Sequence, residues 1–332
     1  MTLKAGVIGL RMGYAHVKGY VGNPHTEVTM VCDTDAARAK EVAAEHGISK
    51  FTTDYRELLA EGLDVVSVAS PDQLHQEHCV AALDAGAHVM CEKPLALTLD
   101  ECQAIVKAAD ASGLKFMVGQ VCRFAPGFVL TKKLIDDGII GNLFLVESEY
   151  AHNYDHARGV GDWRVHPLRH PFVGGACHAV DLVRWIAGNV VECHGYANHR
   201  CLTDWPVDDC LTANLRFESG VIGHVMCSIG CRRPYTMRSC FYGGQGTIIS
   251  DNTSETIQVY STKYPTKLAF SHMPVELASH NVSSELNELI DCIVNDKPVV
   301  TDAREGARTI ATCRAAVESS ETGLPVKVRN EW

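Results

Sequence analysis

Short apolar runs alternate with stretches of helical pattern through the first 120 residues, and this alternation restricts the fold more than any other feature. Runs of strand length lie at residues 4–9, 25–33, 64–70 and 87–91, with helical patterns between them. Strands that alternate with helices of about 10–15 residues indicate a parallel sheet covered by helices. The sequence therefore predicts an α/β dinucleotide-binding (Rossmann) domain over residues 1–122.

The pattern changes in the remainder of the chain. One helical stretch at 126–141 is followed by long runs of alternating polar and apolar residues between Leu143 and Thr262. A period of two is typical of strands with one buried face, and glycine-containing turns such as Gly243-Gly244 separate the runs. Two helical stretches end the chain. We expect a second α/β domain, residues 123–332, with a large, mostly antiparallel open sheet.

Charge and composition narrow the function classes. The formal net charge is −10, with no basic stripe, which argues against nucleic acid as a partner. No run of about 18 apolar residues predicts a membrane span, and the N-terminus does not resemble a signal peptide. The 14 cysteines include no CxxC pair, so we interpret them as reduced core thiols of a cytoplasmic protein and expect no metal site.

The loop after the first strand, "GLRMGYAHVKGY", is an imperfect dinucleotide fingerprint. Gly9 is in place, Arg11 replaces the expected second glycine, and Gly13, after Met12, closes a shortened loop. Asp33 ends the second strand 24 positions after Gly9, where an acidic residue can bind the adenosine ribose and repel a 2′-phosphate. A helix-capping role for Asp33 stays open. NAD is favoured over NADP, although Arg11 and Arg38 leave room for a phosphate.

The strand at 87–91 ends unusually, because it delivers Glu92, Lys93 and Pro94 to its carboxyl end. Ligands of open α/β sheets bind beyond the carboxyl ends of the strands. Pro94 restricts the backbone of Lys93 and thereby the direction of its side chain. From the residues alone, a surface ion pair in a loop remains an alternative.

Several blocks resemble the Gfo/Idh/MocA oxidoreductases. They are "VIGL.MG..H" at the start, "SPDQLHQEHCVAALDAGAHVMCEKPLALTLDE" in the middle, "GGACHAVDLVRW" at 174–185, "YGGQGTIISDN", and "ETGLPVKV" near the end. The resemblance implies a nicotinamide-binding Rossmann domain and a second domain whose open sheet lines the substrate cleft on one face. It also implies hydride transfer at a secondary carbinol of a sugar, inositol or related polyol.

The resemblance further implies that Lys93 and His178 are catalytic, with His178 moving the hydroxyl proton. Asp181 shares a helical face with His178 and could orient its ring. Many sugar-oxidising members carry an aspartate four residues before this histidine, but here that residue is Gly174. Either His178 works with Lys93 alone, or another group such as His170, His152 or Asp155 enters the site.

The other expected site residues fall into two groups, and some of them could equally have ordinary structural roles. The segment at 152–170 holds four histidines without a fixed ligand spacing, so a polar substrate lining is favoured over a metal site. We expect cofactor contacts from Gly9, Arg11, Met12, Gly13, Asp33, Arg38, Ser70, Pro71, His75, Glu92, Lys93, Gln120, Trp163 and Arg164, and substrate contacts from Lys93, Arg123, His152, Tyr154, His178 and Tyr235.

Three functions remain open at this point. An NAD-dependent dehydrogenase is favoured over a redox-neutral enzyme that oxidises a glycoside at its 3-hydroxyl with tightly held NAD, and over a non-catalytic dinucleotide sensor. The chain's few C-terminal helices can cover only one face of the large sheet, and we expect "LTANLRF" and "VIGHVMC" to present apolar residues on the other face, where they need burial. We therefore expect a homodimer or homotetramer.

Overall fold

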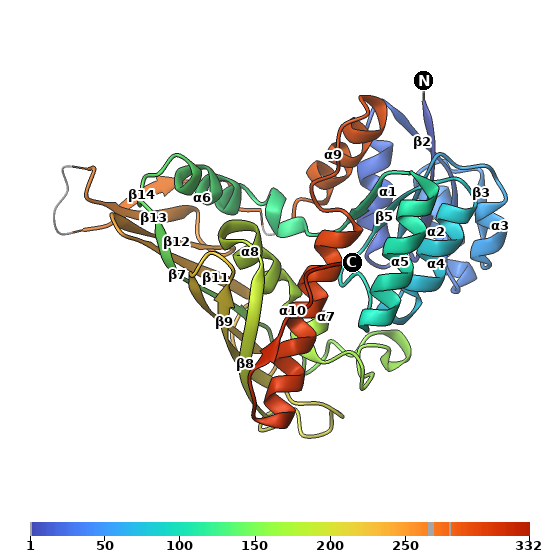
Figure 1. Cartoon of the computed structure of the whole chain (residues 1–332). Helices are drawn as coiled ribbons and strands as arrows, with labels where there is room; N and C mark the ends of the chain where they lie inside the picture. The colour runs from blue at the N-terminus through green and yellow to red at the C-terminus, as the bar shows by residue number, and fades with distance from the viewer. Residues whose placement is uncertain (1, 265–268, 279) are drawn as a thin grey trace. The chain divides into compact units, whose positions relative to one another are not determined.

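The computed structural model describes residues 2–264, 269–278 and 280–332, and its contacts divide the chain into two compact units (Figure 1). The first unit comprises Met1–Gln120, Val282–Ala307 and Trp332, and the second comprises Val121–Asn281 and Arg308–Glu331. The boundary near residue 122 agrees with expectation. The assignment of the whole of 123–332 to the second domain was wrong, because residues 282–307 belong to the first unit.

Packing against the first helix explains this difference. Helix α9 (Val282–Val294) contacts α1 (Gly13–Val21), and the two lie side by side (Figure 1). A Cβ atom at Gly19 would lie only 2.4 Å from Cδ1 of Leu286. The absent side chain therefore lets the two helices approach closely, and the apolar face of α9 is buried in the first unit.

The first unit contains a six-stranded parallel sheet with the order β3-β2-β1-β4-β5-β6, which confirms the predicted Rossmann topology. The strand order reverses between β1 and β4, and the carboxyl ends of all six strands lie at one edge. The strands are β1 (Leu3–Ile8), β2 (Thr26–Cys32), β3 (Lys50–Thr52), β4 (Val65–Val68), β5 (His88–Cys91) and β6 (Phe116–Val118); the further helices are α2 (Ala36–Glu45), α3 (Tyr55–Leu59), α4 (His75–Asp84) and α5 (Leu99–Ser112).

The second unit contains a nine-stranded sheet with the order β14-β13-β12-β11-β7-β10-β9-β8-β15. Among the described residues only β7 and β10 pair in parallel, so the predicted mostly antiparallel sheet is confirmed. The strands are β7 (Leu143–Ala151), β8 (Val190–Asn198), β9 (Cys210–Phe217), β10 (Ile222–Ser228), β11 (Thr236–Gly243), β12 (Gly246–Asp251), β13 (Thr256–Ser261), β14 (Ser271–Pro274) and β15 (Val326–Lys327).

Helices α7 and α8 pack on strand β10, α8 also contacts β7, and α6 contacts β12 and β13. Within the part of the chain that the structure describes, every helix is too short or too polar to cross a bilayer. The helices are α6 (Pro126–Asp136), α7 (Pro171–Gly174), α8 (Cys177–Ala187) and α10 (Ala303–Thr322), the last of which begins in the first unit and continues in the second.

The face of this sheet opposite α8 is more polar than we expected. In β9, Leu211, Ala213 and Leu215 are buried, and in β10, Val225 and Cys227 are buried, so these apolar residues do not lie on that face. The expectation of a large apolar surface from "LTANLRF" and "VIGHVMC" was therefore wrong, because the period of two turns the polar neighbours outward. Residues on the other face include Thr212, Asn214, Arg216, Ile222, His224 and Met226.

Candidate functional site

The loop between β1 and α1 is shaped by its two glycines. Gly9 has a φ of 86°, and a Cβ there would lie 2.5 Å from the carbonyl oxygen of Ala69. A Cβ at Gly13 would lie 2.7 Å from Cγ1 of Val7. Both positions need glycine, so the loop lies close to the sheet as a dinucleotide-binding loop requires. Met12 stands at the start of α1 and is 38% exposed.

The carboxylate of Asp33 stabilises this loop by accepting hydrogen bonds from the backbone. Its Oδ2 accepts a hydrogen bond of 2.7 Å from the backbone N–H of Leu10, and its Oδ1 accepts one of 2.9 Å from that of Asp35. The side chain that caps α2 is Asp35, which accepts from the N–H groups of Ala37 and Arg38. The helix-capping alternative for Asp33 is therefore wrong, and Asp33 lies half-buried at the end of β2.

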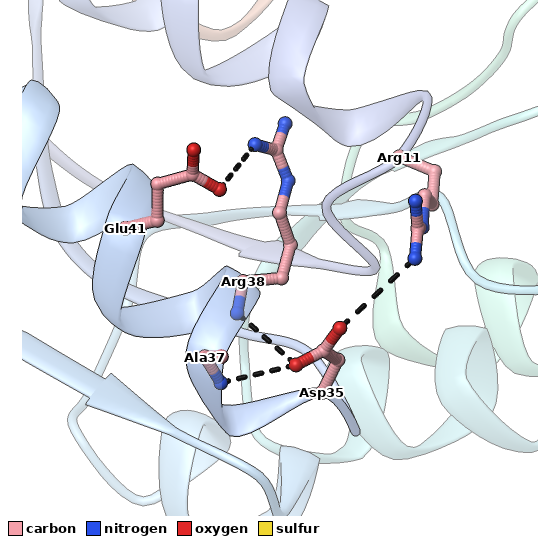
Figure 2. Close-up of a pocket in the computed structure, with 5 residues that line it drawn as sticks. All are labelled: Arg11, Asp35, Ala37, Arg38 and Glu41. Carbon is pink, nitrogen blue, oxygen red and sulfur yellow. Dashed lines mark hydrogen bonds and ion pairs between the residues drawn. The ribbon is translucent and has the colours of Figure 1, made fainter.

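An open pocket beside this loop is lined by Arg11, Asp35, Ala37, Arg38 and Glu41 (Figure 2). Each arginine in it has a carboxylate nearby. Arg38 Nη1 lies 2.9 Å from Oε2 of Glu41, and Arg11 Nη2 lies 4.0 Å from Oδ2 of Asp35. These carboxylates partly neutralise the positive charge that a ribose 2′-phosphate would need.

Glu92, just beyond β5, belongs to a buried chain of hydrogen bonds. Its Oε1 lies 3.1 Å from Nε2 of His16, whose Nδ1 lies 2.9 Å from Oγ of Ser67. The Tyr20 hydroxyl lies 2.9 Å from the same Oγ. Burial alone raises the pKa of Glu92, but the hydrogen bond and charge of His16 and the charge of Lys93 lower it below its usual range. Glu92 is thus held as a carboxylate beside Lys93.

Lys93 follows at the same sheet edge, and its backbone N–H donates to Oε2 of Glu92 at 3.0 Å. The Lys93–Pro94 peptide bond is cis. Two residues beyond the neighbouring strand β6, Gln120 is 1% exposed, and its Oε1 has no hydrogen-bond partner among the described residues. A buried acceptor without a partner is costly, so Oε1 fits a donor from a bound ligand. Together with the glycine loop and Asp33, it fits a dinucleotide along this edge.

Two further expected cofactor contacts come after β4. Ser70 is 9% exposed, its Oγ lies 2.9 Å from Nδ1 of His78, and Pro71 precedes the following 3₁₀ turn. His75 is completely buried, and both of its ring nitrogens face backbone carbonyls. The polar atoms of His75 are thus used inside the protein, so its expected contact with the cofactor stays a prediction that could involve only its carbon atoms.

In the second unit, His178 lies at the start of α8 and is 2% exposed. Its Nδ1 lies 3.5 Å from Sγ of Cys122. The ring of Tyr150 is stacked on the imidazole at 6.4 Å between centroids, and His280 approaches edge-on at 5.5 Å. Sequence reasoning missed Cys122, Tyr150 and His280, because they lie far from His178 in the chain and no spacing links them to it.

A cluster of rings surrounds this histidine. We call it the ring cluster, and it consists of Tyr150, His152, Tyr154, Tyr235 and His280. The hydroxyl of Tyr150 lies 2.8 Å from that of Tyr154 and 3.3 Å from Nδ1 of His152, and Tyr235 stacks on His280. Burial raises the pKa of Tyr150 and of Tyr235 well above 10, so both phenols are neutral and can donate hydrogen bonds. The structure thus brings together His178, His152, Tyr154 and Tyr235, as expected.

Asp181 does not orient the ring of His178. Its Oδ2 accepts 2.7 Å from Nε of Arg123, and its Oδ1 accepts 2.6 Å from Nη2 of Arg123 and 3.2 Å from Oγ1 of Thr309. Both members of this bidentate pair are buried. Asp181 and Arg123 were expected in the site as a catalytic residue and a substrate contact. Instead they form an ion pair with each other, which fixes the position of α8.

The space left by the missing side chain at Gly174 is filled by an arginine. A Cβ there would lie 2.6 Å from Cζ of Arg169, and Arg169 Nη2 donates to the Gly174 carbonyl at 3.3 Å. At Gly175 a Cβ would lie 2.6 Å from Cε1 of Tyr150. Because both residues lack a side chain, the Arg169 guanidinium can pack against Gly174 and the Tyr150 ring can pack against Gly175.

The four histidines of 152–170 do not gather at one point. His152 belongs to the ring cluster, His156 is exposed, and the Nδ1 of buried His170 accepts from the N–H of Phe172 at 3.1 Å. Burial, with Arg314 adding to it, lowers the pKa of His170 to about 4. Within the described residues no group of three or more His, Cys, Asp or Glu side chains has an arrangement that could hold a metal.

Trp163 and Arg164, expected near the cofactor, form a local stack in the second unit. The guanidinium carbons of Arg164 and Arg169 lie 5.0 and 4.9 Å from the centre of the Trp163 ring. Arg164 Nη1 also donates to the Ala157 carbonyl at 3.2 Å. Asp155, an alternative site carboxylate, is exposed and lies 3.9 Å from Arg232.

Comparisons with known proteins agree with this arrangement. Residues 3–120 match the model of an oxidoreductase family with an NAD-binding Rossmann fold, and residues 128–249 match the model of the corresponding GFO/IDH/MocA C-terminal domain. A scyllo-inositol 2-dehydrogenase (NAD(+)) of Bacillus subtilis is 28% identical, over 98% of this chain and 96% of its own, and a D-apiose dehydrogenase of Paraburkholderia graminis is 26% identical, over 92% and 84%.

A solved structure of a levoglucosan dehydrogenase in complex with NADH has the same fold, with a TM-score of 0.91 and 23% identity, and all of each chain is covered. The two family models together span most of the chain, from β1 into β12. The chain belongs to the Gfo/Idh/MocA family of oxidoreductases.

Proposed function

We propose that the chain is an NAD-dependent dehydrogenase that acts on a secondary carbinol, or the matching ketone, of a sugar, inositol or related polyol. The observation that carries this proposal is the placement of His178 within the ring cluster, whose hydroxyl and imidazole groups suit a ligand rich in hydroxyls. The names of the inositol and D-apiose dehydrogenase relatives support the same substrate class.

The cofactor side is supported by the first unit. The glycine loop, Asp33 and the unpaired Oε1 of Gln120 lie along one sheet edge. The neutralised arginine pocket favours NAD over NADP. Trp163 and Arg164 remain predicted contacts near the nicotinamide. When bound, the nicotinamide ring supplies the acceptor or donor of the hydride.

The chain's own residues handle the proton and the charge. In the oxidation direction His178, whose Nδ1 lies 3.5 Å from the Cys122 thiol, accepts the hydroxyl proton. The ammonium of Lys93 stabilises the negative charge that develops on the reacting oxygen. Glu92, kept ionised by His16, holds the backbone N–H of Lys93. Tyr154, Tyr235 and His152 would bind the remaining hydroxyls of the substrate.

A substrate panel tests this function. Purified protein is mixed with NAD or NADP and with inositols, pentoses, hexoses and anhydrosugars, and the absorbance of the reduced cofactor is followed. We expect turnover of at least one polyol with NAD. If NAD stays bound through purification and glycosides are consumed without net reduction, the enzyme is the redox-neutral alternative. No reaction with any member, despite NAD binding, would contradict the proposal.

Assembly into a dimer or tetramer stays a prediction. The exposed face of the large sheet carries Tyr196 and Ile222, which are 66% and 55% exposed. They lie among polar and charged residues, so an interface there would be mixed in character. Light scattering at micromolar concentration is the measurement, and a monomer would refute the prediction.

A further inference from the structure

His75, the first residue of α4, has an unusual pair of hydrogen-bond partners. Its Nδ1 lies 2.7 Å from the carbonyl oxygen of Pro94, and its Nε2 lies 3.0 Å from that of Ser70. The side chain is completely buried, so bulk water does not reach it. Carbonyl oxygens only accept, whereas a neutral imidazole carries a proton on one nitrogen alone. A neutral ring would turn a lone pair toward one of the two carbonyls, and only the doubly protonated ring satisfies both.

We propose that His75 is a permanently charged imidazolium that positions the Lys93 turn by donating to the Ser70 and Pro94 carbonyls at the same time. These carbonyls belong to the segments that leave β4 and β5, which are neighbours in the sheet. One side chain therefore ties together two adjacent strand ends, and Lys93 directly precedes the tied residue Pro94. His75 acts through the backbone of this turn and does not contact the reacting atoms.

The surroundings of His75 contain groups that oppose its charge and groups that favour it. Burial and the N-terminal end of α4 oppose a cation. The carboxylate of Asp72, itself 5% exposed in the preceding 3₁₀ turn, favours it. Burial lowers the pKa of His75, whereas the charge of Asp72 and the Pro94 carbonyl raise it. A Cys91 thiolate would raise it further, but burial raises the pKa of the Cys91 thiol well above 9, so near pH 7 Asp72 and the carbonyls are the groups that favour the charged ring.

His78, one turn further along α4, is a matched contrast. Its Nδ1 lies 2.9 Å from the hydroxyl of Ser70, which can donate as well as accept. Nothing in this contact requires a charged ring, and burial lowers the pKa of His78 to about 4. Two histidines on one helix thus contact the same serine: His75 contacts the Ser70 carbonyl and His78 contacts the Ser70 hydroxyl. The two imidazoles differ in protonation.

The protonation state is tested by nuclear magnetic resonance on wild-type protein labelled with ¹⁵N-histidine. At about pH 8.5, where an ordinary histidine with a pKa near 6.5 is neutral, we expect one ring with protons on both nitrogens. That signal should be absent from His75→Gln and present in His78→Gln. If every wild-type ring has an unprotonated nitrogen at this pH, the proposal is overturned. This measurement needs no assumption about catalysis.

The positioning role rests on the proposed function of Lys93 and is tested by kinetics. A glutamine at 75 cannot reproduce two opposed ring donors, so we expect His75→Gln to lower kcat about tenfold or more, the scale of a misplaced catalytic group, with KM for NAD within about threefold. His78→Gln should keep kcat within about threefold. Wild-type kcat in His75→Gln would overturn the role.

The outcome remains interpretable if the first variant does not fold. His75→Asn, whose shorter amide reaches one carbonyl at most, is then measured in its place, with thermal unfolding as the check on folding. A fully active His75→Asn enzyme would also overturn the role. If Lys93→Ala leaves turnover unchanged, the proposed function fails, whereas the doubly protonated ring of His75 would still be observed.

Discussion

The thiol of Cys122 lies 3.5 Å from Nδ1 of His178, and the two residues come from separate segments, the turn after β6 and the start of α8. The contact links the ring expected to move the substrate proton to a residue that no sequence motif marked. A sulfur partner at Nδ1 favours one orientation of the ring.

Replacing this thiol should therefore change turnover. One hydrogen bond contributes about 1 kcal/mol, which corresponds to about fivefold in rate. We expect Cys122→Ala to lower kcat by that amount and to change its pH profile, whereas Cys122→Ser, which keeps a polar partner, should lose less. Steady-state kinetics over a range of pH is the measurement. Equal and undiminished activity in both variants would show that the contact does not matter.

Lys93→Ala should lower turnover about 10²-fold or more, because an electrostatic or acid–base group is lost from the reacting centre. NAD affinity should change much less. Lys132→Ala is the matched control, since Lys132 is a surface lysine paired with Asp136 at 2.6 Å. Rates within about threefold of wild type for Lys93→Ala would remove Lys93 from the site.

Asp33→Ala should narrow the preference for NAD, because the carboxylate that would bind the ribose and repel a 2′-phosphate is removed. Binding of NAD and NADP is measured by calorimetry in parallel. The variant Asp54→Ala removes the N-cap of α3 instead and should leave the preference unchanged. Wild-type protein that already prefers NADP would contradict the prediction.

Breaking the buried pair of Arg123 and Asp181 should destabilise the protein. Loss of one partner leaves an uncompensated buried charge, which typically costs about 3–5 kcal/mol. We expect Arg123→Met to lower the free energy of unfolding on this scale, and Arg123→Met with Asp181→Leu to recover part of the loss. Denaturant unfolding measures both. Breaking the exposed pair of Lys133 and Asp137 should cost at most about 1 kcal/mol.

The free energy of unfolding should depend on pH partly through the protonation of His75. Its pKa is raised above the usual 6.5 in the folded protein, so folding takes up a proton between pH 6.5 and the folded-state pKa. The stabilisation is complete below pH 6.5 and is lost as the pH rises through the folded-state pKa, with a slope of at most about 1.4 kcal/mol per pH unit. Unfolding measured from pH 6 to 9 should show a shallower decline in His75→Gln. An unchanged slope would contradict the assignment.

The sequence predicted most of the fold because its strands and helices have clear local periods. It did not predict where α9 would pack, since an amphipathic helix has the same pattern whichever sheet it covers. The close contact between Gly19 and Leu286 fixes α9 against α1, and it joins positions far apart in the chain. The polarity of the open sheet face depends on alternate residues of β9 and β10, so the overall hydrophobicity of a stretch does not predict it.

The site was predictable where a motif marks the strand end, as at Gly9, Asp33 and Lys93. The contacts of a site side chain were not predictable where several residues could bind it. The spacing of His178 and Asp181 allowed a contact between them, but Arg123 takes the carboxylate with two hydrogen bonds. His75 carries a family motif, yet only the two carbonyls around it show that it faces the protein interior.

The guanidinium of Arg169 occupies the space that a side chain at position 174 would enter. A side chain introduced at position 174 would meet this guanidinium first, so its effect depends on the residue present at position 169. Substitutions at the two positions should therefore be non-additive, and an aspartate at 174 should be tolerated best where Arg169 is also moved or replaced.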